Sequence, residues 1–268
     1  MMKLLITLKH HKSHLLFVNT VKGNSKFISL LPKDTLFSRG IAFSGSDLVI
    51  SFRRKDKKKD FLFVKNSITK NTEIFQCTNC EFINSIISIF PGKLFVDSAG
   101  TRTIESIDYD PVNFSTFKDD IHYTIGKDQC PVKLNCLYAY RHMWYISCFE
   151  KKRIYDLSNE RVVFSGIEDP NNIFFNSQDR LCFLESGHSL FHCGDDIFHL
   201  DPNCYFRGVI EDPYDGGYWI AFVEKDTSSS GILFIDYDGN IDNVIPFPDK
   251  VDEIYNIVAA RGTWSTEV

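Results

Sequence analysis

The chain has 268 residues, enough for one large domain or two ordinary ones. Its formal net charge of −5 argues against a surface built to cover a polyanion, so we expect no nucleic-acid partner. No apolar run approaches the roughly 18 residues of a membrane helix, and the stretch before Lys9 is too short for a signal-peptide core. We therefore expect no membrane partner and a cytoplasmic location.

The composition favours β-structure. The chain contains 24 Phe, 11 Tyr and 3 Trp, but only 3 Met. Aromatic and β-branched side chains suit the half-buried surface of a pleated sheet, whereas a helical bundle would use more helix formers. The sequence therefore predicts an all-β protein.

Six segments share one order of elements, in which a polar step and a strand are followed by a turn, a second strand, a hairpin and a third strand. One of the six is divided between the two ends of the chain. The N-terminal segment has only a second and a third strand, expected at 15–19 and 26–30. The five complete segments follow in chain order, with first, second and third strands expected at 39–43, 48–52 and 61–64; 84–88, 94–98 and 103–107; 135–139, 144–148 and 153–157; 171–175, 181–185 and 189–192; and 207–211, 218–222 and 231–235. The last segment has a first strand alone, at 255–259.

The first apolar residues of these openings are spaced by about 45 residues on average, the length of a four-stranded blade. They are Ile41, Ile86, Leu137, Ile173, Val209 and Ile257. The repeat predicts a single domain, residues 1–268, that forms one six-bladed β-propeller. The alternative is a seven-bladed or irregular propeller with extra strands hidden in the long segment 108–129.

The two ends of the chain complement each other. The C-terminal strand has no second strand after it, and the N-terminal segment has little in front of its own strands. Pairing them in one blade removes two unpaired sheet edges. We therefore expect residues 253–260 to close the ring against the N-terminal segment, in the blade near residues 14–31.

Several blade motifs resemble those of a known group. The segments 36–43 and 205–209 are similar to the T-R-G-L-A-F step of an uncharacterised NHL-like family of six-bladed β-propellers, a domain of unknown function that is sometimes fused to tetratricopeptide repeats. The segments 93–100 and 180–187 resemble its D-G-R-L-Y-x-x-D-S-G segment. Where that family has P-H-S, this chain has Asp169-Pro170-Asn171-Asn172. The resemblance implies a fold and no chemistry.

In a propeller the first strands line the central channel, so polar residues at their starts are the best candidates for a ligand site. They are Arg39, Asn84, Asn135, Asn171, Arg207 and Asn256. Arg39 and Arg207 flank the closure blade at equivalent positions, and two guanidinium groups suit a carboxylate, phosphate or sulfate. The structural alternative is that the arginines tie neighbouring blades together and that the asparagines satisfy turns.

Groups for acid–base chemistry are fewer. Asp97 and Glu185 end second strands, and His188 follows at a blade turn. A calcium site of the lactonase type needs a first-strand Glu, which the sequence does not place. Cys77 and Cys80 form a C-x-x-C without a second such pair, so we expect no zinc, no other metal and no cofactor. The other cysteines are expected to be buried free thiols, with Cys77 and Cys80 the most reactive.

The basic run from Arg53 to Lys59 lies between two strands of one blade. It favours a solvated hairpin tip, with a docking patch for an acidic partner as the alternative. For function we expect a small polar, anionic ligand at the channel mouth, bound by a lyase-, hydrolase- or isomerase-type tailoring enzyme or by a pure binder. The alternatives are a non-catalytic protein-interaction platform and a structural domain of a larger biosynthetic complex.

Overall fold

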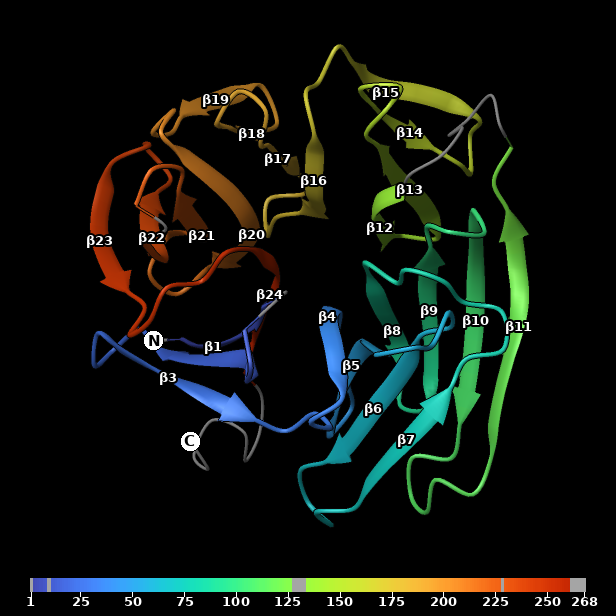
Figure 1. Cartoon of the computed structure of the whole chain (residues 1–268). Helices are drawn as coiled ribbons and strands as arrows, with labels where there is room; N and C mark the ends of the chain where they lie inside the picture. Colours follow the sequence, from blue (N-terminus) through green and yellow to red (C-terminus); the bar gives the residue numbers. More distant parts are fainter. Residues whose placement is uncertain (1, 9–10, 127–133, 228, 261–268) are drawn as a thin grey trace.

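The computed structural model describes residues 2–8, 11–126, 134–227 and 229–260, and these residues form strands without helices. The strands make six antiparallel four-stranded sheets, arranged as blades around a central axis (Figure 1). The protein is thus an all-β, six-bladed β-propeller, as predicted. The seven-bladed alternative is wrong, because the described part of the long segment supplies a turn and the outermost strand of its own blade. Within the described ranges no helix is long and apolar enough to span a membrane.

Each blade runs from an innermost strand at the channel to an outermost strand at the rim. The innermost strands are β4 (Thr35–Ser44), β8 (Ile86–Phe90), β12 (Leu134–Tyr140), β16 (Pro170–Phe175), β20 (Cys204–Asp212) and β24 (Ile254–Ala259). The second strands are β1 (Lys3–Leu8), β5 (Asp47–Arg54), β9 (Lys93–Ser98), β13 (Met143–Cys148), β17 (Leu181–Glu185) and β21 (Gly217–Glu224). The third strands are β2 (His14–Asn19), β6 (Phe61–Asn66), β10 (Thr103–Tyr109), β14 (Arg153–Asp156), β18 (Leu190–Cys193) and β22 (Ser230–Asp236). The outermost strands are β3 (Asn24–Ser29), β7 (Thr72–Gln76), β11 (Phe117–Thr124), β15 (Arg161–Ser165), β19 (Asp196–His199) and β23 (Ile241–Pro246).

The ring closes through strands from both ends of the chain. The C-terminal strand β24 pairs with β1, with Ile257 opposite Ile6, and β1 pairs in turn with β2. Closure is confirmed, but the strands expected in this blade lie one strand further out than predicted. Residues 15–19 lie in the third strand and 26–30 in and just after the outermost one, because the N-terminal segment Lys3–Leu8 is itself the second strand.

The core lies between neighbouring blades. The second strands are apolar on both faces because each blade is covered on both sides, so Leu48, Val49 and Ile50 are all fully buried. Burial decreases outward, and the outermost strand β11 alternates between partly buried and exposed residues. The innermost strands are thereby held rigidly around the channel.

Hydroxyl groups on second strands connect successive blades near one end of the channel. Thr7 Oγ1 donates to the carbonyl of Arg39 over 2.6 Å. Ser51 Oγ accepts from the N–H of Gly40 at 2.8 Å and donates to the carbonyl of Ile83 in the linker to the next blade. These bonds fix the backbone from which the candidate site projects.

Candidate functional site

A pocket with a volume of about 470 Å³ lies at the end of the channel where the innermost strands begin. All six residues predicted to bind a ligand line it: Arg39, Asn84, Asn135, Asn171, Arg207 and Asn256. Nine further lining residues were not predicted, among them Phe82, Asn172, Glu253 and Tyr255. The structure thus brings the predicted set together at one place.

Below the pocket the channel is lined by both apolar and polar groups. A second cavity of about 360 Å³ shares Ser85, Cys136, Asn172 and Asn256 with the first. It is lined by the six apolar residues on which the repeat was aligned: Ile41, Ile86, Leu137, Ile173, Val209 and Ile257. All six side chains are at least nine-tenths buried. The charged groups that could bind an anion, Arg39 and Arg207, therefore lie at the mouth and not along the channel.

β-Bulges aim many of the pocket side chains. The register shifts at the mouth end of five innermost strands, at Arg39-Gly40, Asn135, Asn172-Ile173, Arg207-Gly208 and Tyr255. A bulge residue stands outside the hydrogen-bonded ladder and turns its side chain away from the regular alternation. Gly208 has φ +85°, and a Cβ at Gly40 would come within 2.9 Å of Ile86, so the two R-G steps need glycine.

The remaining blade, β8–β11, has no bulge at the mouth end of its innermost strand, and a buried carboxylate orients the residues there instead. Asp97 Oδ1 accepts hydrogen bonds from the backbone N–H groups of Asn84 and Ser85, at 2.8 and 2.5 Å. Its Oδ2 is buried without a hydrogen-bond partner. Burial raises the pKa of Asp97 to about 7, against the lowering effects of these hydrogen bonds and of the Arg39 charge. Asp97 is 0% exposed and is not among the residues that line the pocket, so it positions Asn84 and does not face a ligand.

Arg39 lies among aromatic rings. Its guanidinium carbon is 4.7 Å from the ring centroids of Phe37 and Tyr255 and 5.2 Å from that of Phe82. Nη1 donates to Asn84 Oδ1 over 2.8 Å, and Nε is buried without a partner. Among the described residues no carboxylate forms an ion pair with Arg39. Its direct contacts are therefore with neutral groups, while the charged side chains of Asp97 and Asp60 act on it from farther away.

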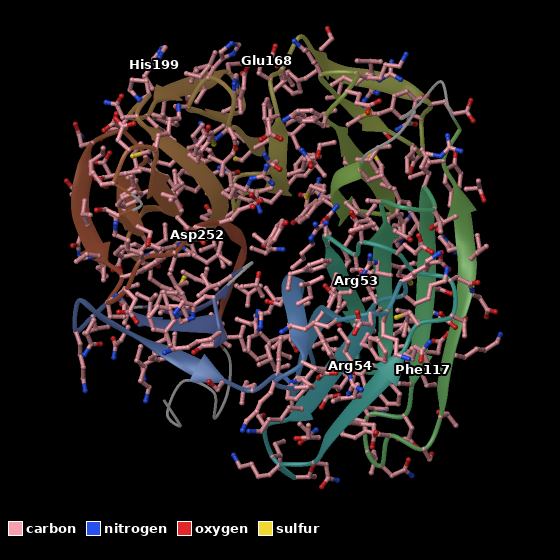
Figure 2. All side chains as sticks on the ribbon, in the orientation of Figure 1. Arg53, Arg54, Phe117, Glu168, His199 and Asp252 are labelled. Atoms are coloured by element: carbon pink, nitrogen blue, oxygen red, sulfur yellow. The ribbon has the colours of Figure 1, made fainter. Side chains whose placement is uncertain are left out.

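A second arginine supports this arrangement from behind. Arg53 lies 3.9 Å from the Phe82 centroid and forms a buried ion pair with Asp60, Nη2 to Oδ1 at 2.6 Å. Arg53 thus holds the ring on which Arg39 rests, and Figure 2 labels it on the inner side of the ring of blades. The sequence placed Arg53 in a solvated hairpin. Only its middle, Lys55 to Lys58, is fully exposed, and Lys59 pairs with Glu81 at 3.0 Å.

Arg207 is held differently. Nη2 is 3.0 Å from Asp169 Oδ2, and Nη1 lies 3.4 Å from Asn171 Oδ1. Asn135 Nδ2 donates to Asp169 Oδ1 at 2.8 Å, so one carboxylate links three blades. Asn172, which has φ +49°, accepts from the N–H of Gly208. Arg207 therefore ties neighbouring blades together at this end of the pocket, through the side chains of Asp169 and Asn171 and not through backbone carbonyls.

A smaller groove adjoins the Arg207 end. It has a volume of about 260 Å³ and is lined in part by Asp169, Asp252, Glu253 and the exposed ring of Tyr205. Figure 2 labels His199 at the rim and Asp252 closer to the channel. The charge around the pocket is therefore uneven: Arg39 lies on one side, and the carboxylates of the smaller groove adjoin Arg207.

The other acid–base candidates lie outside the pocket. Glu185 Oε1 is 2.6 Å from His188 Nδ1, and Oε2 is 2.9 Å from His192 Nε2. Burial raises the pKa of Glu185, but the hydrogen bonds from Glu168 N–H and both histidines outweigh it and leave the pKa low. Glu185 and His188 are not among the lining residues, and the group ties the β17–β18 turn to the preceding linker.

The cysteines differ from expectation in two ways. Cys77 and Cys80 are both 0% exposed, so the C-x-x-C is not a reactive surface pair. Cys148 forms a disulfide bond and is not a free thiol. Cys136 is a buried free thiol beside the pocket, and burial raises its pKa to about 11. It is therefore a neutral lining group.

Solved structures of the same fold are numerous. A chain of a nidogen–laminin complex has a TM-score of 0.74 at 13% identity, over 97% of this chain and 99% of that one. A streptogramin B lyase has a TM-score of 0.54 at 15% identity, over 79% and 69%. Regucalcin from Agrobacterium tumefaciens, a calcium-binding protein, has a TM-score of 0.57 at 14% identity, over 80% and 75%.

No family model and no curated protein matches the chain. The structural neighbours and the sheet topology define the class of protein by its fold, a six-bladed β-propeller. The neighbours include a lyase, a gluconolactonase and a calcium-binding protein. At these identities the likeness establishes the fold and leaves the activity open.

Proposed function

We propose that the protein binds a small anionic ligand in the pocket at the channel mouth, with Arg39 as its anchor. The observation that carries the proposal is the environment of Arg39: a guanidinium that lines the pocket, packs against three rings and has no ion-pair partner among the described residues. Leaving a partly buried charge unpaired costs stability. A carboxylate, phosphate or sulfate would form charge-assisted hydrogen bonds with it.

The rest of the pocket supports a ligand of modest size. Its volume of about 470 Å³ falls within the range of about 300–1,000 Å³ common for small-molecule sites. Asparagine amides from several blades surround it and can both donate and accept. Phe82 and Tyr255 add flat apolar surface next to the charge, which favours an anion carried on an organic framework.

Catalysis would fall to other residues than those predicted. The carboxylate of Glu253 and the phenol of Tyr255 line the pocket, and these are groups that a lyase, hydrolase or isomerase uses to move a proton. The lyase and gluconolactonase among the structural neighbours are propellers with such activities. We propose binding of the anion first, and a reaction of the lyase, hydrolase or isomerase type on the bound anion second.

The test is anion-dependent thermal stabilisation. The full chain is melted with acetate, phosphate, sulfate and a panel of aromatic carboxylates at constant ionic strength. We expect the melting temperature to rise with at least one organic anion, and Arg39→Gln to remove at least nine-tenths of that rise with little change in the anion-free value. Arg39→Ala combined with Arg207→Ala should abolish it.

Arg161→Gln is the matched control, because Arg161 lies on an outermost strand and its side chain is 67% exposed. It should keep the full stabilisation. Unchanged stabilisation in Arg39→Gln would show that the anion binds elsewhere. Aggregation of both Arg39 variants in the absence of anions would assign Arg39 a structural role.

A protein-binding role is the second candidate. The neighbour with a TM-score of 0.74 comes from a complex between two proteins, and Ile89 and Phe90 at the β8–β9 turn are 50% and 58% exposed. In that case Ile89→Ser with Phe90→Ser should abolish partner capture from lysate while anion stabilisation stays intact.

A further inference from the structure

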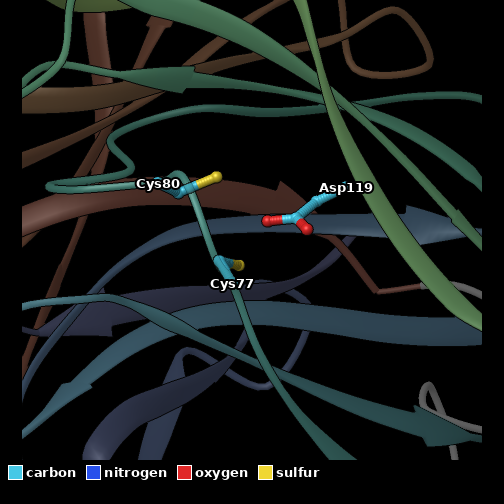
Figure 3. Close-up of side chains that lie close together, drawn as sticks. All are labelled: Cys77, Cys80 and Asp119. Atoms are coloured by element: carbon cyan, nitrogen blue, oxygen red, sulfur yellow. The ribbon is translucent and has the colours of Figure 1, made fainter.

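Two thiols and a carboxylate meet beside the linker between two blades. Cys77 and Cys80 lie between β7 and β8, and Asp119 lies on β11, the outermost strand of the next blade. One donor atom from each lies within 4.8 Å of the other two. Figure 3 shows the carboxylate of Asp119 pointing towards Cys80, with Cys77 beside them.

The carboxylate is held by the turn itself. Asp119 Oδ2 accepts from the N–H of Thr78 at 2.6 Å and from the N–H of Asn79 at 3.3 Å. Oδ1 accepts from the Thr78 hydroxyl at 2.6 Å. Such hydrogen bonds orient metal-binding carboxylates, and each oxygen keeps a further lone pair. The three donors are therefore fixed relative to one another before any ion arrives.

A fourth acidic group lies near them. Glu105 on β10 is 0% exposed, and its Oε2 is buried with no hydrogen-bond partner. It interacts electrostatically with both Cys80 and Asp119. Ile107 pairs with Asp119, and Glu105 lies two residues from Ile107 on the same face of the sheet. The other carboxylate oxygen of Glu105 accepts from the Thr103 hydroxyl, so a cation would satisfy the oxygen that has no partner.

We propose that Cys77, Cys80 and Asp119 bind one zinc-type divalent ion, and that Glu105, which lies outside the group of three donors, shifts towards the ion to complete the site. A tetrahedral zinc ion with Zn–S bonds of about 2.3 Å holds its donor atoms roughly 3.3–3.8 Å apart, so the observed separation requires only a small contraction. Two thiolates select a soft or borderline ion over calcium or magnesium. Asp119 is partly exposed, which leaves the ion a path from solvent.

The sequence argument against zinc was the missing second C-x-x-C. The structure supplies the remaining donors from β10 and β11 instead, strands that follow in the chain but belong to the neighbouring blade. A bound ion would therefore cross-link the blade of β4–β7, through its exit linker, to the blade of β8–β11. This site is independent of the pocket at the channel mouth.

The test uses cobalt(II) as a spectroscopic probe. The reduced full chain is stripped of metal with a chelator, dialysed and titrated with Co²⁺. We expect thiolate-to-cobalt charge-transfer bands that saturate at one ion per chain and disappear when Zn²⁺ is added. Cys77→Ser and Cys80→Ser should each abolish the bands, whereas Cys204→Ser, at another buried free thiol, should leave them unchanged.

Two isosteric variants keep the proposal testable if the cysteine variants fail to fold. Asp119→Asn keeps an acceptor for the turn but loses the charge, and it should weaken zinc binding roughly 10- to 100-fold. Glu105→Gln should weaken it less. Absence of charge-transfer bands in the reduced wild type overturns the proposal. So do bands that persist in Cys77→Ser, and so does unchanged zinc affinity in Asp119→Asn.

Discussion

The two arginine ends of the pocket begin from the same local motif and reach opposite electrostatic states. Arg39 and Arg207 each precede a glycine in a β-bulge, one on each side of the closure blade. Arg207 meets the carboxylate of Asp169, whereas Arg39 meets an amide and three rings. The difference lies in what the adjoining linkers present, so a motif in one blade does not determine the chemistry of its side chain.

Removing the strand between the two arginines should have the largest effect. Deletion of residues 253–268 removes β24, exposes the β1 edge and takes away Tyr255, one of the Arg39 rings. Each unpaired buried group costs about 1–3 kcal/mol, against a net stability of roughly 5–15 kcal/mol. We expect insoluble or molten protein, measured by circular dichroism and size-exclusion chromatography.

A cooperative, soluble monomer from that deletion would contradict ring closure through β24. The shorter deletion of 262–268 is the comparison. We expect it to be nearly silent unless Trp264 caps the channel, and these residues lie outside the described part of the chain.

The Arg39 end is supported by a fully buried carboxyl group, Asp97, which holds the backbone of Asn84. Because burial raises the pKa of Asp97 to about 7, the folded protein keeps this proton while the unfolded chain loses it near its ordinary pKa of 3.8. The carboxyl therefore lowers the free energy of unfolding as pH rises from about 4 to 7. Asp97→Asn should remove that loss, worth up to about 4 kcal/mol between pH 4 and 8.

Urea unfolding of Asp97→Asn at several pH values measures this effect. Asp238→Asn, an exposed position in the β22–β23 turn, is the control and should follow the wild type at every pH. If the Asp97→Asn and wild-type curves stay parallel, the Asp97 carboxyl is ionised in the folded protein throughout that pH range.

The smallest effect is expected at the Arg207 end. Asp169→Asn removes the ion pair and frees Arg207 for the ligand, while its amide oxygen can still accept from Asn135. The pair is partly exposed, so it is worth about 1 kcal/mol or less. We expect anion binding to tighten by about fivefold or less in a calorimetric titration. Weaker binding would mean that Asp169 positions Arg207 for the ligand.

The sequence carries the repeat well, because each inner strand must present an apolar residue to the channel. Ile41, Ile257 and their four equivalents line the lower cavity as aligned, and the polar residues just before them line the pocket. The signal was local, and the isolated glycines of the two R-G steps also mark bulges. The features that local sequence patterns predicted, namely the inner strands and the polar residues at their starts, are present in the structure.

The sequence could not place groups that act across blades. Asp169 and Asp119 acquire their roles from residues in other blades, and neither stands in a motif of its own. Glu185 and Asp97 looked equivalent at the ends of second strands, yet one binds two histidines and the other two backbone N–H groups. The strand 3–8 was missed because its short and mostly apolar sequence shows no regular alternation of polar and apolar residues.

The bulges at the channel mouth separate the pairing of strands from the presentation of side chains to the pocket. A side chain inside the ladder packs against its cross-strand neighbours, whereas a bulge residue stands outside the regular pairing. At Asn135, Arg207 and Tyr255 the side chain can be exchanged while the register on either side stays the same. A propeller of this kind can acquire a new ligand through single substitutions at the channel mouth, while the structure of the blades stays the same.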